Sequence, residues 1–151
     1  MGNPARGDDG FGPALIAALP ALPGVVAFDA GMAPENWLGP IARAEPRTVL
    51  FVDAADIGEA PGTLRLLRAE ELGGCGLSTH ALPLGLLLPI AEERCGAPCL
   101  LLAVQPLSLA HGERLSMPVQ AALQAAAKAI AAAAASPRRQ PRTVWTPIRD
   151  L

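Results

Sequence analysis

The sequence predicts an α/β fold, specifically a three-layer α/β/α sandwich around a twisted, mostly parallel sheet. Short apolar segments of strand length alternate along the chain with longer segments that carry helix start and stop signals. The two strongest apolar segments, at 48–52 and 100–104, are apolar almost throughout, which is typical of strands buried on both faces of a parallel sheet. Sites in such folds form at the carboxyl ends of strands, so polar residues at those positions are the first candidates.

Four segments are predicted to be strands. They are enriched in Val, Leu or Phe, and two of them directly follow a Pro-Gly pair, which favours a turn. The predicted strands are residues 25–28, 48–52, 63–67 and 100–104.

Helices are predicted at 13–19, 33–43, 84–94 and 119–135. Pro13 and Pro118 stand where the first turn of a helix accepts proline, and Gly96 provides a C-cap. Pro40 is expected to shorten or kink the second helix, and Pro137 to end the fourth.

The chain is predicted to form one domain at residues 1–136, followed by an irregular basic tail at 137–151. Residues 136–151 contain four Arg and one Asp, so the rest of the chain has eight basic and 13 acidic residues, a net charge of −5. A body this acidic is a poor partner for nucleic acid. The sequence has no signal-peptide pattern and no apolar segment long enough for a bilayer, so a cytoplasmic protein without a membrane partner is expected.

The cysteine pattern excludes two kinds of structural site. Cys75, Cys95 and Cys99 are an odd number at spacings that match neither a disulfide framework nor a zinc site. They are therefore expected to be inert thiols.

A glycine-rich segment, GNPARGDDGFGP at 2–13, runs into the first predicted helix. Its glycines permit positive φ angles, and Asp8 and Asp9 stand just before the helix. Capping of that helix explains one aspartate, and we assign this role to Asp8. Two adjacent carboxylates exceed what a cap requires, and they would repel a phosphate, so Asp9 is a candidate functional residue.

Two further candidates stand at comparable junctions. Asp53 ends the apolar segment 48–52, where a buried carboxylate requires a hydrogen bond, an opposite charge or a metal, although a simple capping role is the alternative. His80 shortly precedes the predicted helix 84–94, and a structural histidine is its alternative. Together with Asp9, these residues form an O,O,N ligand set that suits Zn²⁺ or Ni²⁺ and leaves the ion an open position.

Several short motifs stand in a fixed order from Gly2 to the long helix near the C-terminus, each at a predicted loop. They are GNPARGDDGFGP (2–13), DAGMAPEN (29–36), FVDAADIG followed by PGT (51–58 and 61–63), STHALPL (78–84) and VQP (104–106). In this ordered set the chain resembles the hydrogenase maturation protease family, particularly the branch that processes the hydrogenase of the formate-hydrogen-lyase type.

The resemblance implies an aspartic-type endopeptidase that removes the C-terminal extension of a nickel-iron hydrogenase large-subunit precursor after nickel insertion. That precursor is the implied partner of a monomeric protease, and it would bring the nickel, with no organic cofactor required. The resemblance also implies that Asp9, Asp53 and His80 are both the metal-binding and the catalytic residues.

The resemblance further implies substrate contacts at the cleft. The residues that match the family there are Asp29, Glu35, Asn36 and Gln105, and for Gln105 a side chain that caps a loop is the alternative. The family also places a strand before the Gly-Asn-Pro loop, with which this chain begins. The sheet is therefore expected to lack that first strand, and the natural start to lie upstream of Met1.

Other functions remain open from the sequence. A nonenzymatic metallochaperone or scaffold would dock on the same precursor without cutting it, and a metal-dependent peptidase of this fold would act on another substrate. A nucleotide-binding domain is the third alternative, which the twin aspartates oppose. The sequence contains no HExxH or GxSxG motif that would indicate a different protease mechanism.

Overall fold

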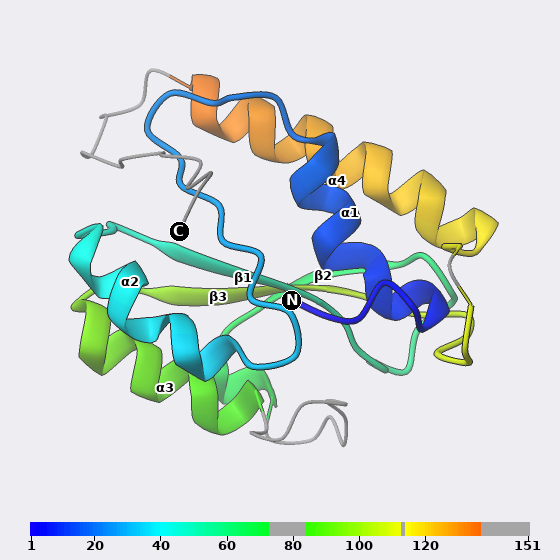
Figure 1. Ribbon diagram of the computed structural model, residues 1–151, viewed down its shortest axis with the longest axis horizontal. Coiled ribbons are helices and arrows are strands. Elements are labelled where there is room, and N and C mark those ends of the chain that lie inside the picture. The colour runs from blue at the N-terminus through cyan, green and yellow to red at the C-terminus, as the bar shows by residue number, and fades with distance from the viewer. Residues whose placement is uncertain (73–83, 113, 137–151) are drawn as a thin grey trace.

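The computed structural model describes residues 1–72, 84–112 and 114–136 of the 151-residue chain (Figure 1). Four α-helices and three strands form its frame, and short 3-10 helices cover Gly7–Gly10, Pro34–Trp37 and Ala69–Leu72. In chain order the frame consists of α1 (Phe11–Ala18), α2 (Leu38–Arg43), β1 (Val49–Ala54), β2 (Leu64–Leu67), α3 (Leu84–Cys95), β3 (Cys99–Val104) and α4 (Met117–Ala135).

The three strands form one sheet in the order β1-β3-β2. β1 and β3 are parallel, with Val49 opposite Cys99 and Ala54 opposite Val104. β2 pairs with β3 in the antiparallel direction. The described sheet is therefore mixed rather than mostly parallel as expected. The connection from β1 to β2 contains no helix that would return the chain to the start of the sheet, so β2 runs in the opposite direction to β1 and to its own neighbour β3.

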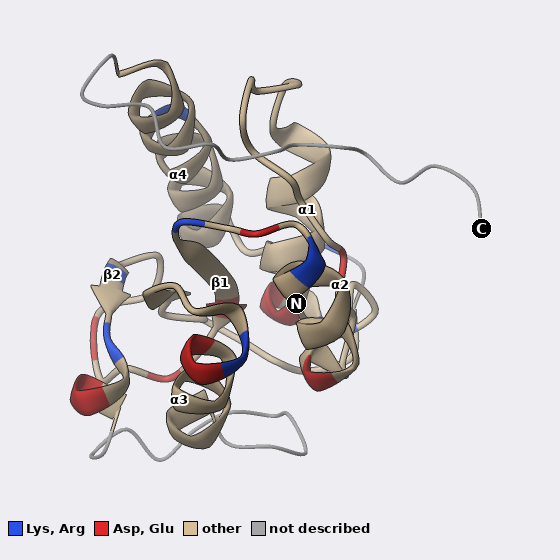
Figure 2. Cartoon of the chain, turned by 90° about the vertical axis from the view of Figure 1, so that its left-hand side faces the viewer, with Lys and Arg blue, Asp and Glu red and all other residues tan. Residues whose placement is uncertain are grey.

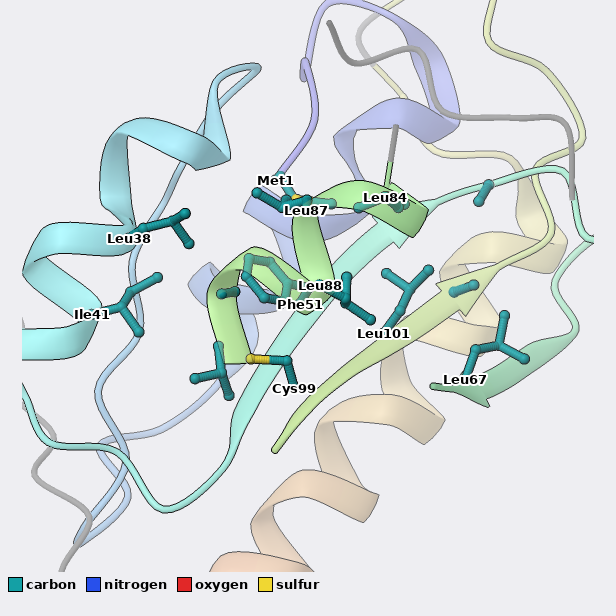
Figure 3. Packing of buried hydrophobic residues seen from close by; sticks show 14 residues of the cluster. Met1, Leu38, Ile41, Phe51, Leu67, Leu84, Leu87, Leu88, Cys99 and Leu101 are labelled. Atoms are coloured by element: carbon teal, nitrogen blue, oxygen red, sulfur yellow. The ribbon is translucent and has the colours of Figure 1, made fainter. Parts of the chain in front are cut away.

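Helices cover both faces of this sheet, which confirms the three-layer sandwich. Figure 1 shows α1 and α4 on one face and α2 and α3 on the other. Alternate residues of the strands serve the two layers, as the period of a strand requires. Phe51 and Leu101 pack with α2 and α3 (Figure 3). Ala54 and Val104 pack with α1 and α4.

The long helix α4 is almost free of charge. Lys128 is its one charged residue, and Figure 2 shows the rest of the helix in the colour of uncharged residues. Val119, Ala122, Leu123 and Ala126 recur at helical spacing and are buried against α1 and the sheet. The helix is therefore held by packing of this narrow apolar face rather than by ion pairs.

Three predicted strands and all four predicted helices are confirmed to within a few residues at their ends. The segment 33–43 divides into the 3-10 helix Pro34–Trp37 and α2, so that Pro40 falls in the first turn of α2, where proline is tolerated. Gly96 ends α3 with a positive φ of 61°, and its amide donates to the carbonyl of Glu92 (2.9 Å).

The predicted strand at 25–28 is wrong. These residues form an irregular segment. At its start, the amide of Val25 donates to the carbonyl of Leu22 (3.2 Å). An apolar groove of about 190 Å³ lies between this segment and β1, lined by side chains of both. A strand needs backbone hydrogen bonds to a neighbouring strand. The groove separates the segment 25–28 from β1, so these residues do not pair with it.

β1 is the edge strand of the described sheet on the side of this groove. The amides of Val49 and Ala55 donate toward β3, so Leu50 and Val52 direct their backbone groups to the other side. There the Met1 α-ammonium donates to the carbonyl of Val52 (2.9 Å). The side chain of Leu50 is 38% exposed, although it lies within the apolar β1.

None of the helices that the structure describes combines the length and the apolar character needed to cross a membrane.

Candidate functional site

Asp53 lies near the carboxyl end of β1, opposite Ala103 of β3. It is completely buried, and the alternation of the strand directs its side chain to the layer that contains α2 and α3. Burial of a carboxylate is costly unless nearby groups compensate its charge. The carboxyl end of a strand, where Asp53 lies, is where α/β folds form their sites.

Asp9 reaches the same end of the sheet from the opening loop. It belongs to the 3-10 helix Gly7–Gly10, is 1% exposed, and accepts a hydrogen bond from the Asn3 amide on Oδ2 (3.0 Å). Gly2 has a φ of 120°, and a Cβ at this position would overlap the carbonyl oxygen of Asp9. A glycine is required here because the loop folds back closely over the Asp9 backbone.

The Met1 ammonium reveals the electrostatic character of this region. Burial lowers the pKa of the ammonium, while the negative charges of Asp53, Asp29 and Asp9 act in the opposite direction. These carboxylates come from β1, the 29–36 loop and the opening loop, and the negative charge of each acts on the same ammonium. The negative charge of these three groups thus extends to the carboxyl end of β1.

Among the three residues predicted to bind metal, Asp9 and Asp53 lie in the described structure, whereas His80 lies outside the described residues. Within residues 1–72, 84–112 and 114–136, the His, Cys, Asp and Glu side chains do not gather in any group of three that would hold a metal ion. The predicted ligand set therefore stays a prediction, of which Asp9 and Asp53 are the two members that the structure describes.

Asp8 does not cap α1, contrary to the expectation from the sequence. Its buried carboxylate accepts hydrogen bonds from the amides of Leu107, Ser108 and Ser116 and from the Ser116 hydroxyl. All of these donors belong to the loop that follows β3. Asp8 therefore joins two segments that are about a hundred residues apart in the sequence, which no local capping pattern could indicate.

The predicted substrate-contact residues of the second motif lie on one loop and the 3-10 helix that follows it. Asp29 is exposed and accepts a hydrogen bond from the Gly31 amide (3.1 Å), and the carbonyl of Gly31 in turn accepts one from the amide of Gly2 (2.8 Å). In the 3-10 helix Pro34–Trp37, Glu35 is half-buried and Asn36 is exposed. The 29–36 loop is thus tied directly to the loop that carries Asp9.

Gln105 is buried, and its side chain organises the loop between β1 and β2. Its Oε1 accepts hydrogen bonds from the amides of Ile57 (2.8 Å) and Glu59 (3.3 Å), and its Nε2 donates to Asp56 Oδ1 (3.1 Å). This geometry corresponds to the loop-capping alternative, because both ends of the side-chain amide bind the protein itself.

The cysteine environment in the described residues agrees with inert thiols. Burial is the main cause that raises the pKa of the Cys99 thiol to about 12, and the nearby Cys95 and Glu92 contribute to the same rise. Burial also raises the pKa of Cys95. Cys75 lies outside the described residues.

Sequence reasoning missed Ser116 and Asn3. Ser116 supplies both an amide and a hydroxyl to Asp8, and Asn3 supplies an amide to Asp9 and stabilises its own loop through the bond from the Ala5 amide to Asn3 Oδ1. Asn3 belongs to the same glycine-rich motif as Asp9, so the sequence could have indicated that the two residues interact. Ser116 has no such signal, because its partner is 108 residues away.

Comparison with known proteins identifies the family. The family model described as hydrogenase maturation protease matches residues 15–133. The Hydrogenase 3 maturation protease of Escherichia coli K12 is 32% identical over 127 residues, which cover 82% of this chain and 81% of that protein.

Solved structures agree with this match. The crystal structure of the [NiFe] hydrogenase maturation protease HycI from Thermococcus kodakarensis has a TM-score of 0.75 at 32% identity, covering 87% of this chain and 86% of that one. The hydrogenase maturating endopeptidase HybD from E. coli has a TM-score of 0.71 at 30% identity, with 87% and 86% covered. This chain, a peptide hydrolase of α/β fold, therefore belongs to the hydrogenase maturation protease family.

Proposed function

We propose that this chain removes the C-terminal extension of a nickel-iron hydrogenase large-subunit precursor after nickel has been inserted. Membership in the hydrogenase maturation proteases supports the reaction class. The observation that carries the proposal for the site is the pair of buried carboxylates, Asp9 and Asp53, at the carboxyl end of β1.

In this proposal Asp9 and Asp53, together with His80, meet the nickel that the precursor already holds. Carboxylate oxygens and an imidazole nitrogen are suitable donors for Ni²⁺, and the incoming ion would compensate the negative charge of the carboxylates. Nickel held by these residues would supply positive charge beside the scissile carbonyl. Recognition of nickel by these residues makes cleavage depend on correct metal loading.

The hydrolysis itself requires a base close to the scissile bond. One of the two buried carboxylates takes a proton from the attacking water as its oxygen bonds to the carbonyl carbon. The same proton then passes to the leaving amide nitrogen as the carbon–nitrogen bond breaks. This step consumes one water and releases the tail peptide with a new amino terminus.

Residues at the rim would hold the precursor during this reaction. Asp29, Glu35 and Asn36 are half-buried or exposed and lie on the segment that is hydrogen-bonded to the opening loop through Gly2 and Gly31. We assign them to substrate contact. Gln105 would contribute indirectly, because its side chain holds the 56–59 loop through the amides of Ile57 and Glu59.

The test is the intact mass of the nickel-loaded precursor before and after incubation with this chain. Loss of a C-terminal peptide from nickel-loaded precursor, and no loss from nickel-free precursor, is the expected result. Tight binding without any mass loss, by a chain shown to be folded, would contradict the protease function and favour a metallochaperone or scaffold. Equal cleavage of unrelated peptides would favour a peptidase with another substrate.

A further inference from the structure

Asp8 and Asp9 are adjacent, equally buried carboxylates that enter different surroundings. Each is 1% exposed. Consecutive residues of a 3-10 helix point about 120° apart, because the helix has about three residues per turn. Asp9 therefore joins the opening loop through Asn3, while Asp8 faces the loop 107–116 that follows β3.

The Asp8 carboxylate is saturated with donors. Its Oδ2 accepts from the Leu107 amide (2.8 Å), the Ser108 amide (3.1 Å) and the Ser116 hydroxyl (2.9 Å), and its Oδ1 accepts from the Ser116 amide (2.6 Å). Hydrogen bonds to a charged acceptor are the strong ones, and these four also join both ends of the loop 107–116 to one side chain. The carboxylate thus compensates its own burial entirely within this loop.

The backbones of the two loops are joined as well. The Asp8 amide donates to the Ser108 carbonyl (3.1 Å), the Gly7 amide to the Gly112 carbonyl (2.6 Å), and the Gly112 amide to the Ala5 carbonyl (2.9 Å). The loops lie side by side at the right of Figure 1. Because Asp8 is bonded through both its backbone and its side chain, the peptide that leads to Asp9 has little freedom to move.

We propose that Asp8 is a positioning residue for hydrolysis: through the amides of 107–108 and through Ser116, it holds Asp9 in the orientation that the reaction requires. The inference rests on the proposed function, in which Asp9 is one of the reacting carboxylates. Misplacement of a reacting group by about 1 Å costs on the order of 100-fold in rate. A residue that never touches the substrate therefore affects turnover while leaving substrate affinity nearly unchanged.

The experiment weakens this connection without changing Asp9. Ser116→Ala deletes the hydroxyl donor and keeps the backbone donor, Ser116→Thr restores a hydroxyl, and Asp8→Asn turns one acceptor oxygen into a donor that faces amide donors. Glu92→Ala is the matched control, because Glu92 accepts a bond from the Cys99 amide (2.9 Å) at the opposite end of β3. Thermal unfolding, kcat and KM on nickel-loaded precursor, and the NMR signals of the Asp9 amide and carboxyl carbon are measured for each.

We expect Ser116→Ala to lower kcat about tenfold and Asp8→Asn about 100-fold at temperatures where each variant is folded, with little change in KM. The Asp9 signals move in both variants, and Ser116→Thr restores the signals and kcat. Glu92→Ala lowers the melting temperature but leaves kcat and the Asp9 signals as in the original chain.

Unchanged kcat and unchanged Asp9 signals in Ser116→Ala and Asp8→Asn would overturn the inference. Equal losses of kcat in Glu92→Ala would also overturn it, since the effect would then follow general stability. If the original chain fails to cut nickel-loaded precursor, the proposed function fails, and the Asp9 signals alone decide whether Asp8 positions Asp9.

Discussion

At the scale of single residues, three buried aspartates are compensated in two different ways. Asp8 is satisfied by amides and a hydroxyl, as a structural carboxylate is. Asp9 instead accepts a hydrogen bond from the Asn3 amide, and the charges of Asp9 and Asp53 both act on the Met1 ammonium at the carboxyl end of β1. Three aspartates in the same part of the fold therefore differ in role: Asp8 is structural, whereas Asp9 and Asp53 have a proposed catalytic role.

Asp53→Ala and His80→Ala are expected to abolish processing, with a loss of about 100-fold or more, because each removes a proposed nickel-recognition and catalytic group. Cleavage of nickel-loaded precursor, followed by intact mass, measures the effect. Glu59→Ala, which removes an exposed carboxylate paired with Arg65, is the control and keeps full activity. A large loss of thermal stability in Asp53→Ala with activity retained in the folded fraction would instead indicate a capping role.

Gly2→Ala is expected to lower the free energy of unfolding by at least about 2 kcal/mol. The new Cβ would overlap the Asp9 carbonyl oxygen, and the φ of 120° is unfavourable for any side chain. Gly58→Ala is the control, since Gly58 also has a positive φ (72°) but an open surrounding, and we expect a loss of about 1 kcal/mol. Urea unfolding measures both, and equal losses would mean that the close approach at Gly2 contributes nothing.

The Cys99 thiol is expected to make the free energy of unfolding depend on pH in the alkaline range. Its pKa is about 12 in the folded protein and about 8.5 in an unfolded chain. As pH rises above about 8.5, the unfolded chain loses this proton first, so the free energy of unfolding falls progressively from about pH 8.5 to about pH 12.

The sequence contains no Tyr and a single Lys, which leaves few other groups to titrate in this range. We expect Cys99→Ala to show a shallower decline than the original chain in urea unfolding. Parallel curves for the two proteins would contradict the assignment.

At the scale of elements, the site depends on how loops are attached to the ends of the strands. β1 and β3 carry Asp53 and Gln105 to the same end of the sheet, since parallel neighbours end together. Gln105 then fixes the loop after β1, and Asp8 fixes the loop after β3. Rigid strands therefore set the positions, and buried polar side chains set the conformations of the loops.

Gln105→Ala is expected to lower the free energy of unfolding by about 2–3 kcal/mol, because it leaves the partly buried amide of Ile57 without its acceptor. Gln120→Ala is the control: Gln120 also donates from its side chain to a carbonyl, that of Leu115 (2.8 Å), but it is exposed. We expect a change of about 0.5 kcal/mol or less there. Comparable losses in both variants would show that burial of the Gln105 amide is unimportant.

At the scale of the whole molecule, the edge of β1 is the least complete part of the described fold. The groove beside it is lined by apolar side chains from the segment 25–28, from α1 and from β1 itself. The carbonyl of Val52 is bonded there to the buried ammonium of Met1. A charged group that burial destabilises thus occupies a place where a neutral backbone amide would fit.

An extension of about five Val and Ile residues joined to the amino end is expected to add a strand parallel to β1. It would bury apolar side chains in the groove and replace the ammonium by an amide, for a net gain of about 1–3 kcal/mol after the loss of chain entropy. An extension of the same length made of Gly and Ser is the control. Equal free energies of unfolding for the two proteins would mean that the groove does not accept a strand.

The sequence by itself determined the α/β class, the positions of three strands and four helices, and the candidacy of Asp9 and Asp53. These predictions rest on local patterns: periodicity, proline and glycine signals, and charges at the ends of apolar segments. Such patterns can be recognised without knowledge of the fold. The strand prediction at 25–28 failed for the same reason, since a β-branched segment becomes a strand only beside a partner.

Only the tertiary structure decided what the other polar residues do. Asp8 was expected to cap its own helix, yet it binds a loop a hundred residues away, and Gln105 holds the loop of a different strand. The direction of β2 and the open edge of β1 were likewise decided by sheet order. Hydrogen bonds between distant segments depend on which strands become neighbours, and no local pattern in the sequence encodes that arrangement.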